Sequence, residues 1–433
     1  MLQLDARSAD FAVAFESLLH MKRETDEDVN ATVAAIIADV RDRGDQALVE
    51  YTAKFDRLPH LTAADLLITA AEVDEALTQV PAALMQSLEL AAERIAEFHR
   101  RQVPQGYSYT DAAGVRLGQR WTAVQAAGLY VPGGTAAYPS SVLMNAIPAK
   151  VAGVERLVMV VPTPDGKINP LVLAAARLAG IDEIYRVGGA QAVAALAHGT
   201  ETIRPVDKIV GPGNAYVAAA KRQVFGIVGI DMIAGPSEIL VVADGANDPA
   251  WIAADLLSQA EHDTAAQSIL ITDDAQFGAR VAQAVESHLQ VLPRAAIARE
   301  SWQAHGAIIV VPDLADAVVL VDRIAPEHLE LAVENPDALA AKVRNAGAIF
   351  LGRYTPEAVG DYIGGPNHVL PTARSARFSS GLGVHDFMKR TTLLGCDAES
   401  LRAIGPAAVA LAGAEGLGAH GLSVALRLNM ARS

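Results

Sequence analysis

The sequence predicts an α/β protein made of two doubly wound, incomplete Rossmann-like modules, with a helical N-terminal region and a helical C-terminal tail. From about residue 122, short and nearly continuous apolar runs alternate with helical stretches and Gly/Pro turns. Strands that are covered by helices on both faces need such runs. The regions before and after carry apolar residues at helical spacing instead. At roughly 100–200 residues per domain, 433 residues allow two to four domains.

The first 105 or so residues are expected to be helical. The segment from Asp28 to Val40 has apolar residues at helical spacing, and residues 84–99 repeat this pattern. Thr69 and Glu72 have the spacing of a capping box, in which a hydroxyl and a carboxylate bind free backbone N–H groups at a helix start. After about residue 378 the chain is rich in alanine and is expected to be helical to its end.

The apolar runs of the central region are expected to form strands. They cover residues 157–161, 184–187, 208–210, 239–242, 269–271, 308–311 and 348–351. Residues 235–237, Gly-Pro-Ser, are expected to mark the junction between the two modules. The predicted division is an N-terminal segment (1–26), a first α/β domain (27–129 and 239–378), a second α/β domain (130–238) and a C-terminal tail (379–433).

Composition excludes several classes of partner. The formal net charge of −15 argues against nucleic acid and anionic membranes and is compatible with a cationic substrate. The single cysteine cannot build a disulfide framework, which is typical of a reducing compartment. The first residues lack the basic and apolar regions of a signal peptide, and no uninterrupted apolar run is long enough to span a bilayer. We therefore expect a soluble, cytoplasmic protein.

Three glycine-rich turns follow or adjoin predicted strands, at residues 128–134, 188–191 and 211–214. Such turns let backbone N–H groups approach a phosphate closely. One isolated turn of this kind more often merely connects a strand to a helix. With three such turns in one module, nucleotide binding and plain strand-to-helix connections are about equally good explanations. A further match to G-x-G-x-x-G, at residues 416–421, follows a helical stretch and leaves only twelve residues after it. No βαβ unit fits there, so we reject it as a dinucleotide fingerprint.

Two polar motifs have spacings that suit site chemistry. Gln259 and His262 are three residues apart at the end of a helix that is expected to begin near Pro249, so both side chains share one face and could hold a metal. Glu327 and His328 are adjacent in a predicted turn or helix start, and such a pair can carry two-step proton chemistry once its environment separates the two pKa values. Taken alone, each motif is more typical of a solvated helix end or turn.

Two further pairs lie nearer the C-terminus. Asp361 and His368 are expected in a tight loop rich in Gly, Pro and Asn, and carboxylate and imidazole are suitable zinc ligands. Glu415 and His420 lie in the tail, where a solvated helix face explains them equally well. Cys396 has an acidic neighbour and no nearby base that would lower its pKa, so we assign it a structural role.

Taken together, these motifs resemble the histidinol dehydrogenase family. The matching segments are residues 234–238, 257–262, 326–329, 360–371 and 378–390, and the similarity runs in unbroken order from about residue 25 to the C-terminus. A single one of these motifs would be weak evidence, whereas the ordered series is specific.

The resemblance implies a zinc ion, one per subunit, and NAD⁺ as cofactor. The implied zinc ligands are Gln259, His262, Asp361 and His420, the last reaching over from the other subunit of a homodimer. The implied acid/base pair is Glu327 and His328. The implied NAD⁺ contacts are Tyr130, Gln191 and Asn214, each in a glycine-rich turn. The implied substrate contacts are the zinc ligands with Ser237, His328, His368 and Glu415.

The activity implied by the resemblance is a four-electron oxidation of L-histidinol through histidinaldehyde to L-histidine, the last step of histidine synthesis, with two NAD⁺ consumed. Two alternatives stay open on sequence grounds. One is a related dehydrogenase that oxidises another small alcohol, such as a sulfonated diol. The other is a zinc- or nucleotide-binding protein without catalysis, which the presence of both Glu327 and His328 disfavours.

Overall fold

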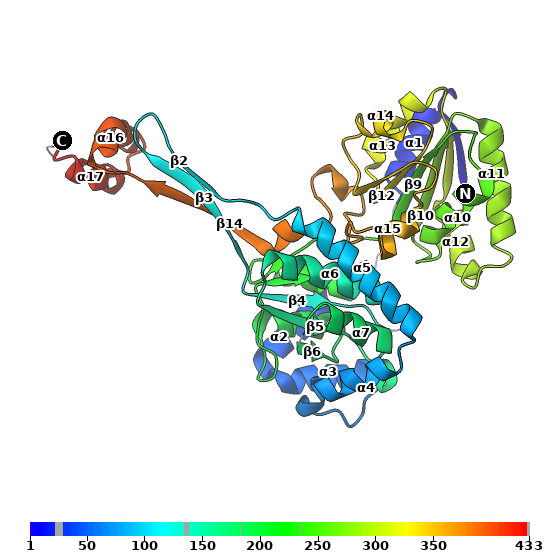
Figure 1. Ribbon diagram of the computed structural model, residues 1–433, viewed down its shortest axis with the longest axis horizontal. Coiled ribbons are helices and arrows are strands. Elements are labelled where there is room, and N and C mark those ends of the chain that lie inside the picture. The colour runs from blue at the N-terminus through cyan, green and yellow to red at the C-terminus, as the bar shows by residue number, and fades with distance from the viewer. Residues whose placement is uncertain (22–28, 134–137, 182, 234, 431–433) are drawn as a thin grey trace.

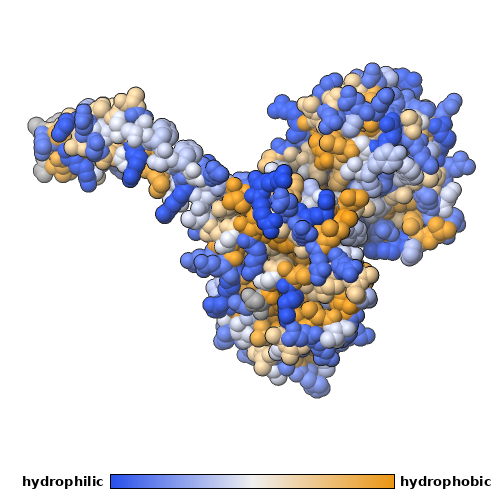
Figure 2. All heavy atoms as spheres, in the orientation of Figure 1, coloured by the Kyte–Doolittle hydropathy of each residue, from blue (hydrophilic) through white to orange (hydrophobic). Residues whose placement is uncertain are grey.

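Two α/β lobes and one projecting arm make up the protein in a computed structural model that describes residues 1–21, 29–133, 138–181, 183–233 and 235–430 (Figure 1). The predicted boundary at residues 26 and 27 and the predicted turn residue Gly134 lie outside these ranges. Hydrophilic side chains cover much of the face seen in Figure 2, interrupted by apolar patches on both lobes. Within the described residues, no helix is both long and apolar enough to cross a membrane.

The five-stranded lobe is built on a parallel sheet with the order β6-β5-β4-β7-β8. Its strands are β4 (Ala126–Tyr130), β5 (Arg156–Val160), β6 (Glu183–Tyr185), β7 (Lys208–Val210) and β8 (Gly229–Ile230). One face is covered by α4 (Ala70–Thr78), α5 (Ala82–Arg100), α6 (Pro139–Ala152) and α7 (Pro170–Leu178). The other is covered by α2 (Asn30–Arg43), α3 (Asp45–Phe55), α8 (Gly189–His198) and α9 (Ala215–Val224). The sheet is thus buried on both faces, as its continuous apolar runs require.

The six-stranded lobe is also a parallel sheet, with the order β1-β11-β10-β9-β12-β13. Its strands are β1 (Leu2–Asp5), β9 (Glu238–Ala243), β10 (Gln267–Thr272), β11 (Ala307–Val310), β12 (His328–Ala332) and β13 (Ala348–Leu351). One face is covered by α10 (Pro249–Ala260), α11 (Ala275–His288) and α12 (Ala295–His305). The other is covered by α1 (Phe11–Leu19), α13 (Ala317–Ile324) and α14 (Pro336–Ala340), and α15 (Glu357–Tyr362) follows β13. Short 3₁₀ turns occupy Ala63–Leu66, Pro164–Gly166, Leu314–Asp316, Ser375–Arg377 and Val384–Phe387.

The predicted strands and helices agree largely with the structure. All seven apolar runs form strands, the capping box at Thr69 and Glu72 is present, and α10 begins at Pro249 as expected. Residues 235–237 do separate the two sheets, because β8 belongs to one and β9 to the other. In the two lobes, the strands β1, β4, β8 and β12 were not predicted. For β12 the expectation of a turn or helix start was wrong, because every residue from His328 to Ala332 is buried between two parallel neighbours.

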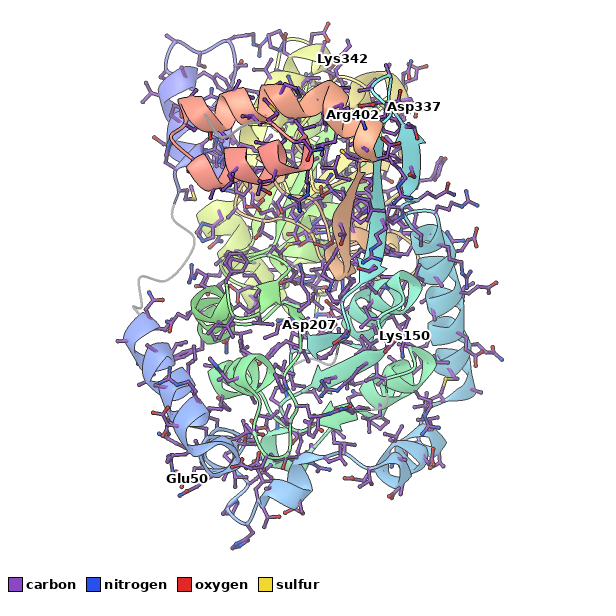
Figure 3. The ribbon with its side chains drawn as sticks, turned by 90° about the vertical axis from the view of Figure 1, so that its left-hand side faces the viewer. Glu50, Lys150, Asp207, Asp337, Lys342 and Arg402 are labelled. Carbon is purple, nitrogen blue, oxygen red and sulfur yellow. The ribbon has the colours of Figure 1, made fainter. Side chains whose placement is uncertain are left out.

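The arm is a three-stranded antiparallel sheet with two helices at its tip. The strands have the order β14-β3-β2, with bounds β2 (Tyr107–Thr110), β3 (Arg116–Ala123) and β14 (Met388–Gly395). The helices α16 (Ala398–Ala414) and α17 (Gly418–Arg427) follow. The arm projects away from both lobes in Figure 1, and its helices lie in front of the six-stranded lobe in Figure 3. The tail from residue 379 is therefore not wholly helical as expected, because β14 pairs along its full length with β3.

The division of the chain also differs from the prediction. Residues 30–100 were grouped with residues 239–378, but α2 and α3 pack against α8 and α9, and α4 and α5 pack against α6 and α7. The N-terminal segment instead joins the six-stranded lobe, where β1 pairs with β11. The apolar face of a helix indicates that the helix packs against something, without saying against which sheet it packs.

Candidate active site

A pocket of about 530 Å³ lies where α5 meets the amino-terminal edge of the six-stranded sheet. Its walls include Phe98 of α5, His328 of β12, Phe350 of β13, Asp361 of α15 and His368. In open parallel sheets, ligands more usually bind at the carboxyl ends of the strands. Here the pocket lies at the amino-terminal ends of the strands instead, because His328 is the first residue of β12 and Asp361 lies in α15, the helix that follows β13.

His328 is fixed by the sheet and directs one ring nitrogen toward the pocket. It is 4% exposed, and its Nδ1 lies 2.9 Å from the backbone oxygen of Glu238. A carbonyl can only accept, so Nδ1 carries a hydrogen, and in the neutral ring Nε2 holds the lone pair. Nε2 has no hydrogen-bond partner and lies 3.8 Å from Oε1 of Glu357 and 4.0 Å from Oδ1 of Asp361. His328 therefore has the geometry of a general base.

Glu327 is a buried carboxyl beside that imidazole. Its Oε2 accepts a hydrogen bond of 2.9 Å from the backbone N–H of Glu238, and Oε2 of Glu238 accepts one of 3.3 Å from the backbone N–H of Glu327. Oε2 of Glu327 lies 3.7 Å from Nδ1 of His328. Burial raises the pKa of Glu327 well above its usual value, and the nearby negative charges add to the rise. A carboxyl with a raised pKa suits proton transfer near neutral pH.

Glu357 and Asp361 form a coupled carboxyl pair one turn apart on α15. Glu357 is 1% exposed, and its Oε2 accepts a hydrogen bond of 2.9 Å from Oγ of Ser258. Burial, with the charge of Glu357, raises the pKa of Asp361 to about 9. Burial also opposes ionisation of Glu357, but the charge of His328 and hydrogen bonds with Asp361 and Ser258 lower its pKa. The pair therefore holds one proton in the absence of a cation.

The end of α10 brings Gln259 and His262 to the same place. Gln259 is 1% exposed, and its Oε1 is buried without a hydrogen-bond partner. His262 is exposed at the surface, yet desolvation by the surrounding atoms lowers its pKa, and the charges of Glu357 and His328 act on it. Both residues therefore lie within electrostatic reach of the carboxyl pair.

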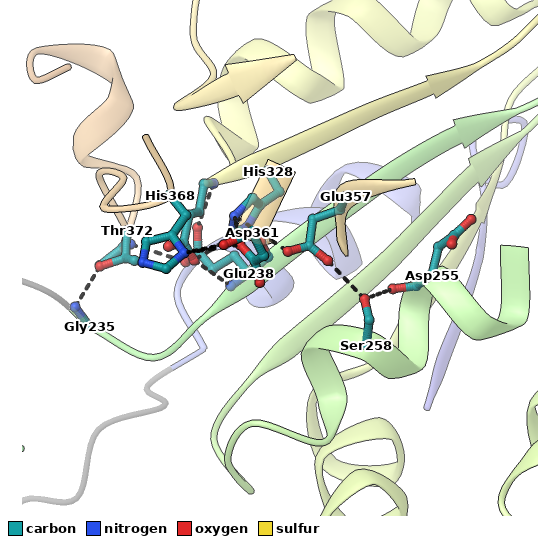
Figure 4. A network of polar contacts seen from close by, with 11 residues as sticks. Gly235, Glu238, Asp255, Ser258, His328, Glu357, Asp361, His368 and Thr372 are labelled. Carbon is teal, nitrogen blue, oxygen red and sulfur yellow. Dashed lines mark hydrogen bonds and ion pairs between the residues drawn. The ribbon is translucent and has the colours of Figure 1, made fainter. Parts of the chain in front are cut away.

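The donor set fits a divalent cation. In this cluster of described residues, three buried acceptor atoms have no hydrogen-bond partner: Oε1 of Gln259, Nε2 of the neutral His328 ring and Oε1 of Glu357. Among the described residues, ligand atoms of His328, Glu357 and Asp361 lie within 4.8 Å of one another. Figure 4 shows these three side chains converging from β12 and α15. Buried acceptors without donors are costly, and a cation would satisfy them.

His368 lies against Asp361, as its predicted place in the same segment suggested. Its Nδ1 is 2.9 Å from the backbone oxygen of Asp361, and its Nε2 is 3.3 Å from Oγ of Ser141. Burial lowers the pKa of His368 to about 4, so its ring is neutral at physiological pH. Asp361 itself lies in α15 rather than in the predicted loop.

Three predicted residues lie outside this cluster. Ser237 precedes β9 and is half-buried beside Glu238, and its backbone oxygen accepts from the N–H of Gln267. Glu415 ends α16 and His420 lies in α17; both are exposed on the arm, away from the pocket of their own chain (Figures 1 and 3). Gln259, His262 and Asp361 of one chain therefore each interact with Glu357, whereas His420 of that chain lies on the arm.

The three glycine-rich turns lie at the carboxyl edge of the five-stranded sheet. Tyr130 ends β4, is 4% exposed, and accepts a hydrogen bond of 3.0 Å at its hydroxyl from the N–H of Gly189. Gln191 lies in the first turn of α8, and its Oε1 is buried without a partner. Asn214 caps α9, where its Oδ1 accepts from two backbone N–H groups. This arrangement suits a dinucleotide.

Comparisons with known proteins agree with one another. The family model described as histidinol dehydrogenase matches residues 19–428. The chain belongs to the histidinol dehydrogenase family. It is 74% identical over 429 residues to the histidinol dehydrogenase of Rhodospirillum rubrum, covering 99% of each chain, and 66% identical to that of Bradyrhizobium diazoefficiens, again over 99% of each. The crystal structure of the histidinol dehydrogenase from Elizabethkingia anophelis superposes with a TM-score of 0.94 at 38% identity, covering 99% of this chain and 98% of that one.

In this member of the histidinol dehydrogenase family, the sequence motifs missed two glutamates that the structure places beside His328. Glu357 was missed although it precedes Asp361 by four residues, a spacing that puts both on one face of a helix. Glu238 was missed although it follows Ser237 directly and supplies the carbonyl that orients His328. In both cases the signal existed only once α15 and β9 were known to be a helix and a strand.

Proposed function

We propose that this chain oxidises L-histidinol through histidinaldehyde to L-histidine, with two molecules of NAD⁺ as oxidant. The observation that carries the proposal is the position of a base, Nε2 of His328, within a cluster of buried ligand atoms that suits a divalent cation. Membership of an NAD-dependent oxidoreductase family supports it, and so do the turns that suit a dinucleotide. The curated relatives at 63–74% identity share one name, which favours histidinol over another small alcohol such as a sulfonated diol.

The proposed metal is zinc, held by Gln259, His262 and Asp361 of one chain and by His420 of a second copy. The first three residues are supported by their convergence beside His328 and Glu357. When bound, the ion would act as a template for the imidazole and amine of the substrate. A neutral His262, whose pKa is lowered, suits a ligand that must offer a lone pair.

The proposed homodimer is supported by the arm. His420 is exposed at its tip, together with large apolar side chains that no element of the same chain covers. Leu394 is 72% exposed, Leu411 65% and Leu426 56%. Exposed apolar groups of this size on one element are typical of a protein interface. The proposed location is the cytoplasm, where the lone exposed thiol of Cys396 would stay reduced.

In the proposed first step, Nε2 of His328 takes the hydroxyl proton of histidinol while a hydride leaves its carbinol carbon for the nicotinamide. The product of this step is the aldehyde. The hydrogen bond from Nδ1 to the carbonyl of Glu238 holds the ring in the required tautomer and stabilises the imidazolium that forms. The position of His328 at the start of a buried strand keeps the base from moving between the two steps.

In the proposed second step, Glu327 takes a proton from the water that attacks the aldehyde, and His328 returns the proton it gained in the first step to the aldehyde oxygen. The neutral ring of His328 then takes a hydroxyl proton of the resulting hydrate as the second hydride leaves. The raised pKa of Glu327 makes its carboxylate a stronger base than an ordinary one. The proposed substrate contacts are Ser237, His368 and Glu415, the last reaching the pocket from the arm of the second copy. Retention of the aldehyde in the pocket preserves the proximity gain.

The experiment that tests the proposal follows NADH absorbance with histidinol and with a small diol, before and after chelation, for wild type and Glu327→Gln. We expect turnover of histidinol only, lost on chelation. Because Glu327 is needed for the attack of water, Glu327→Gln should slow oxidation of supplied histidinaldehyde at least about tenfold more than oxidation of the alcohol. Equal loss of both half-reactions would contradict the assigned roles, and turnover of the diol instead would refute the substrate.

A further inference from the structure

A buried ion pair lies beneath the turn that joins β7 to α9. The side chains of Lys221 and Asp231 form a close salt bridge and are 3% and 1% exposed. Both also bind a single residue of the turn. Nζ of Lys221 donates to the backbone oxygen of Gly211 at 3.0 Å, and the backbone N–H of Gly211 donates to Oδ2 of Asp231 at 2.8 Å. The pair thus fixes both polar groups of one residue.

Gly211 in turn meets the neighbouring glycine-rich turns. Its φ of +113° is a conformation that side chains rarely adopt, and a Cβ there would lie 2.1 Å from the backbone oxygen of Tyr130. The hydroxyl of Tyr130 accepts from the N–H of Gly189. Since the turns after β4, β6 and β7 touch one another through Tyr130, the position of Gly211 bears on all three, including that of Asn214 three residues later.

The cost of burying this pair also needs a reason. Two charges removed from water lose much of their hydration, and a buried ion pair is often no more stabilising than apolar side chains of the same volume. A hydrophobic pair at residues 221 and 231 would fill the space, but it could not hold the N–H and the carbonyl of Gly211. The special contribution of Lys221 and Asp231 is therefore the geometry of the turn.

We propose that Lys221 and Asp231 are positioning residues for NAD⁺: through Gly211 they hold the turns of Tyr130 and Asn214 in the arrangement that binds the dinucleotide. The inference rests on the proposed function, in which these turns contact NAD⁺. Neither charged group reaches the surface, so both act through the backbone of the turn.

The test is the double variant Lys221→Met/Asp231→Leu, which removes both charges together and leaves neither one unpaired. We expect the KM for NAD⁺ to rise about tenfold or more, since two hydrogen bonds to the turn are lost. The kcat at saturating NAD⁺, the KM for histidinol and the zinc content should change less than about twofold.

A matched control lies at the opposite edge of the same sheet. Arg156 and Glu183 form a partly buried ion pair at the amino ends of β5 and β6, far from the turns. Arg156→Met/Glu183→Leu should leave the KM for NAD⁺ within about twofold of wild type. If the Lys221/Asp231 double variant does not fold, Lys221→Arg serves instead. It keeps the ion pair but puts a wider head under Gly211, and should raise the same KM.

Two results would overturn the inference: an unchanged KM for NAD⁺ in the folded variant, or equal changes in all kinetic constants for the variant and its control. Asn214→Ala separates this failure from that of the proposed function. If Asn214→Ala also leaves the KM for NAD⁺ unchanged, the dinucleotide binds elsewhere and the proposed function is wrong in that respect. If only Asn214→Ala raises it, the turn binds NAD⁺ without needing the ion pair.

Discussion

The coupled carboxyl pair predicts that zinc affinity depends steeply on pH, and that Glu357→Gln weakens this dependence. In the cation-free protein, the pKa of Asp361 is about 9, because of burial and the charge of Glu357. A proposed ligand that keeps its proton at neutral pH must release it when the metal binds. The pKa of His262 is lowered instead, so this ring releases no proton above about pH 6.5.

The magnitude follows from one proton. Below pH 9, the apparent affinity should rise about tenfold per pH unit, which leaves it about a hundredfold below its limit at pH 7. Ligand atoms of Glu357 and Asp361 lie within 4.8 Å. At an effective dielectric constant of about 20, two charges at that distance repel by about 3.5 kcal/mol, or about two and a half pH units. In Glu357→Gln that repulsion is gone, so the rise in apparent affinity should end about two and a half pH units lower.

The net affinity at one pH is a poor readout, because loss of a carboxylate near the metal itself weakens binding by about 10–100-fold. The slope separates the two effects. We suggest competition against a chelator of known proton affinity, from pH 6 to pH 9, with wild type, Glu357→Gln and the control Glu330→Gln. Glu330 is a buried carboxyl that also contacts the backbone of Glu357, but its pKa of about 10 keeps it neutral over this pH range. Glu330→Gln therefore changes no charge beside the pair and should keep the wild-type slope.

The refuting result is a wild-type affinity that stays level between pH 7 and pH 8.5, since Asp361 would then be ionised already without a cation. An identical slope in wild type and Glu357→Gln would show instead that burial alone retains the proton. Either outcome would remove the argument that the pair is an acid/base-coupled metal site.

Three further predictions concern stability and assembly. Burial and a neighbouring carboxyl raise the pKa of Glu330 to about 10 from its ordinary 4.5. Between these two pH values the folded state keeps a proton that the unfolded chain loses. The contribution of Glu330 to stability is therefore fully present below pH 4.5 and is lost as the pH rises to about 10. In denaturant unfolding from pH 6 to 8.5, the free energy of unfolding should therefore fall about 1.4 kcal/mol per pH unit faster in wild type than in Glu330→Gln. Parallel plots of this free energy against pH for the two proteins would contradict the prediction. Gly211→Ala should destabilise the fold by about 2 kcal/mol or more in thermal melts, because its Cβ would clash with the backbone of Tyr130. The control Gly226→Ala, also at positive φ but with open space around the new Cβ, should destabilise it by only about 1 kcal/mol. Equal losses of stability in the two variants would count against the clash. Mixing inactive His262→Asn with inactive His420→Asn chains should restore about a quarter of wild-type activity, because half of the dimers are hybrids with one intact site; no recovery would argue against a shared site.

The elements that could be predicted are those whose burial produces a recognisable pattern of apolar residues along the sequence. The seven apolar runs form strands because a strand covered on both faces is apolar throughout. The strand β14 has no such signal, since most of its residues, from Lys389 to Leu394, are exposed on the arm. β12 was missed for a different reason: Pro326 and the polar pair Glu327–His328 are typical of turns, and only the pairing with β9 and β13 makes them a strand start.

The candidate site shows the same division. Gln259, His262 and Asp361 were predicted together from a resemblance, and each of them interacts with Glu357. Glu357 itself lies in no motif and was found only from the geometry of α15. The contacts that orient His328 were also beyond the sequence, because they join residues about 90 positions apart through the pairing of β9 and β12. Such contacts depend on sheet order, which no local pattern encodes.

The proposed zinc site combines rigidly held residues of one chain with a ligand, His420, that stands on the arm. His328 is held on both sides by strand pairing, with Ile239 in β9 and Ala348 in β13, and its ring is oriented by a carbonyl of β9. A base fixed in this way cannot move to meet a ligand, so any missing ligand has to be brought to it. His420 stands on an arm that carries it away from the pocket of its own chain. If zinc needs His420, the cation cluster is complete only when the arm of a second copy reaches it, and catalysis then requires the assembled pair.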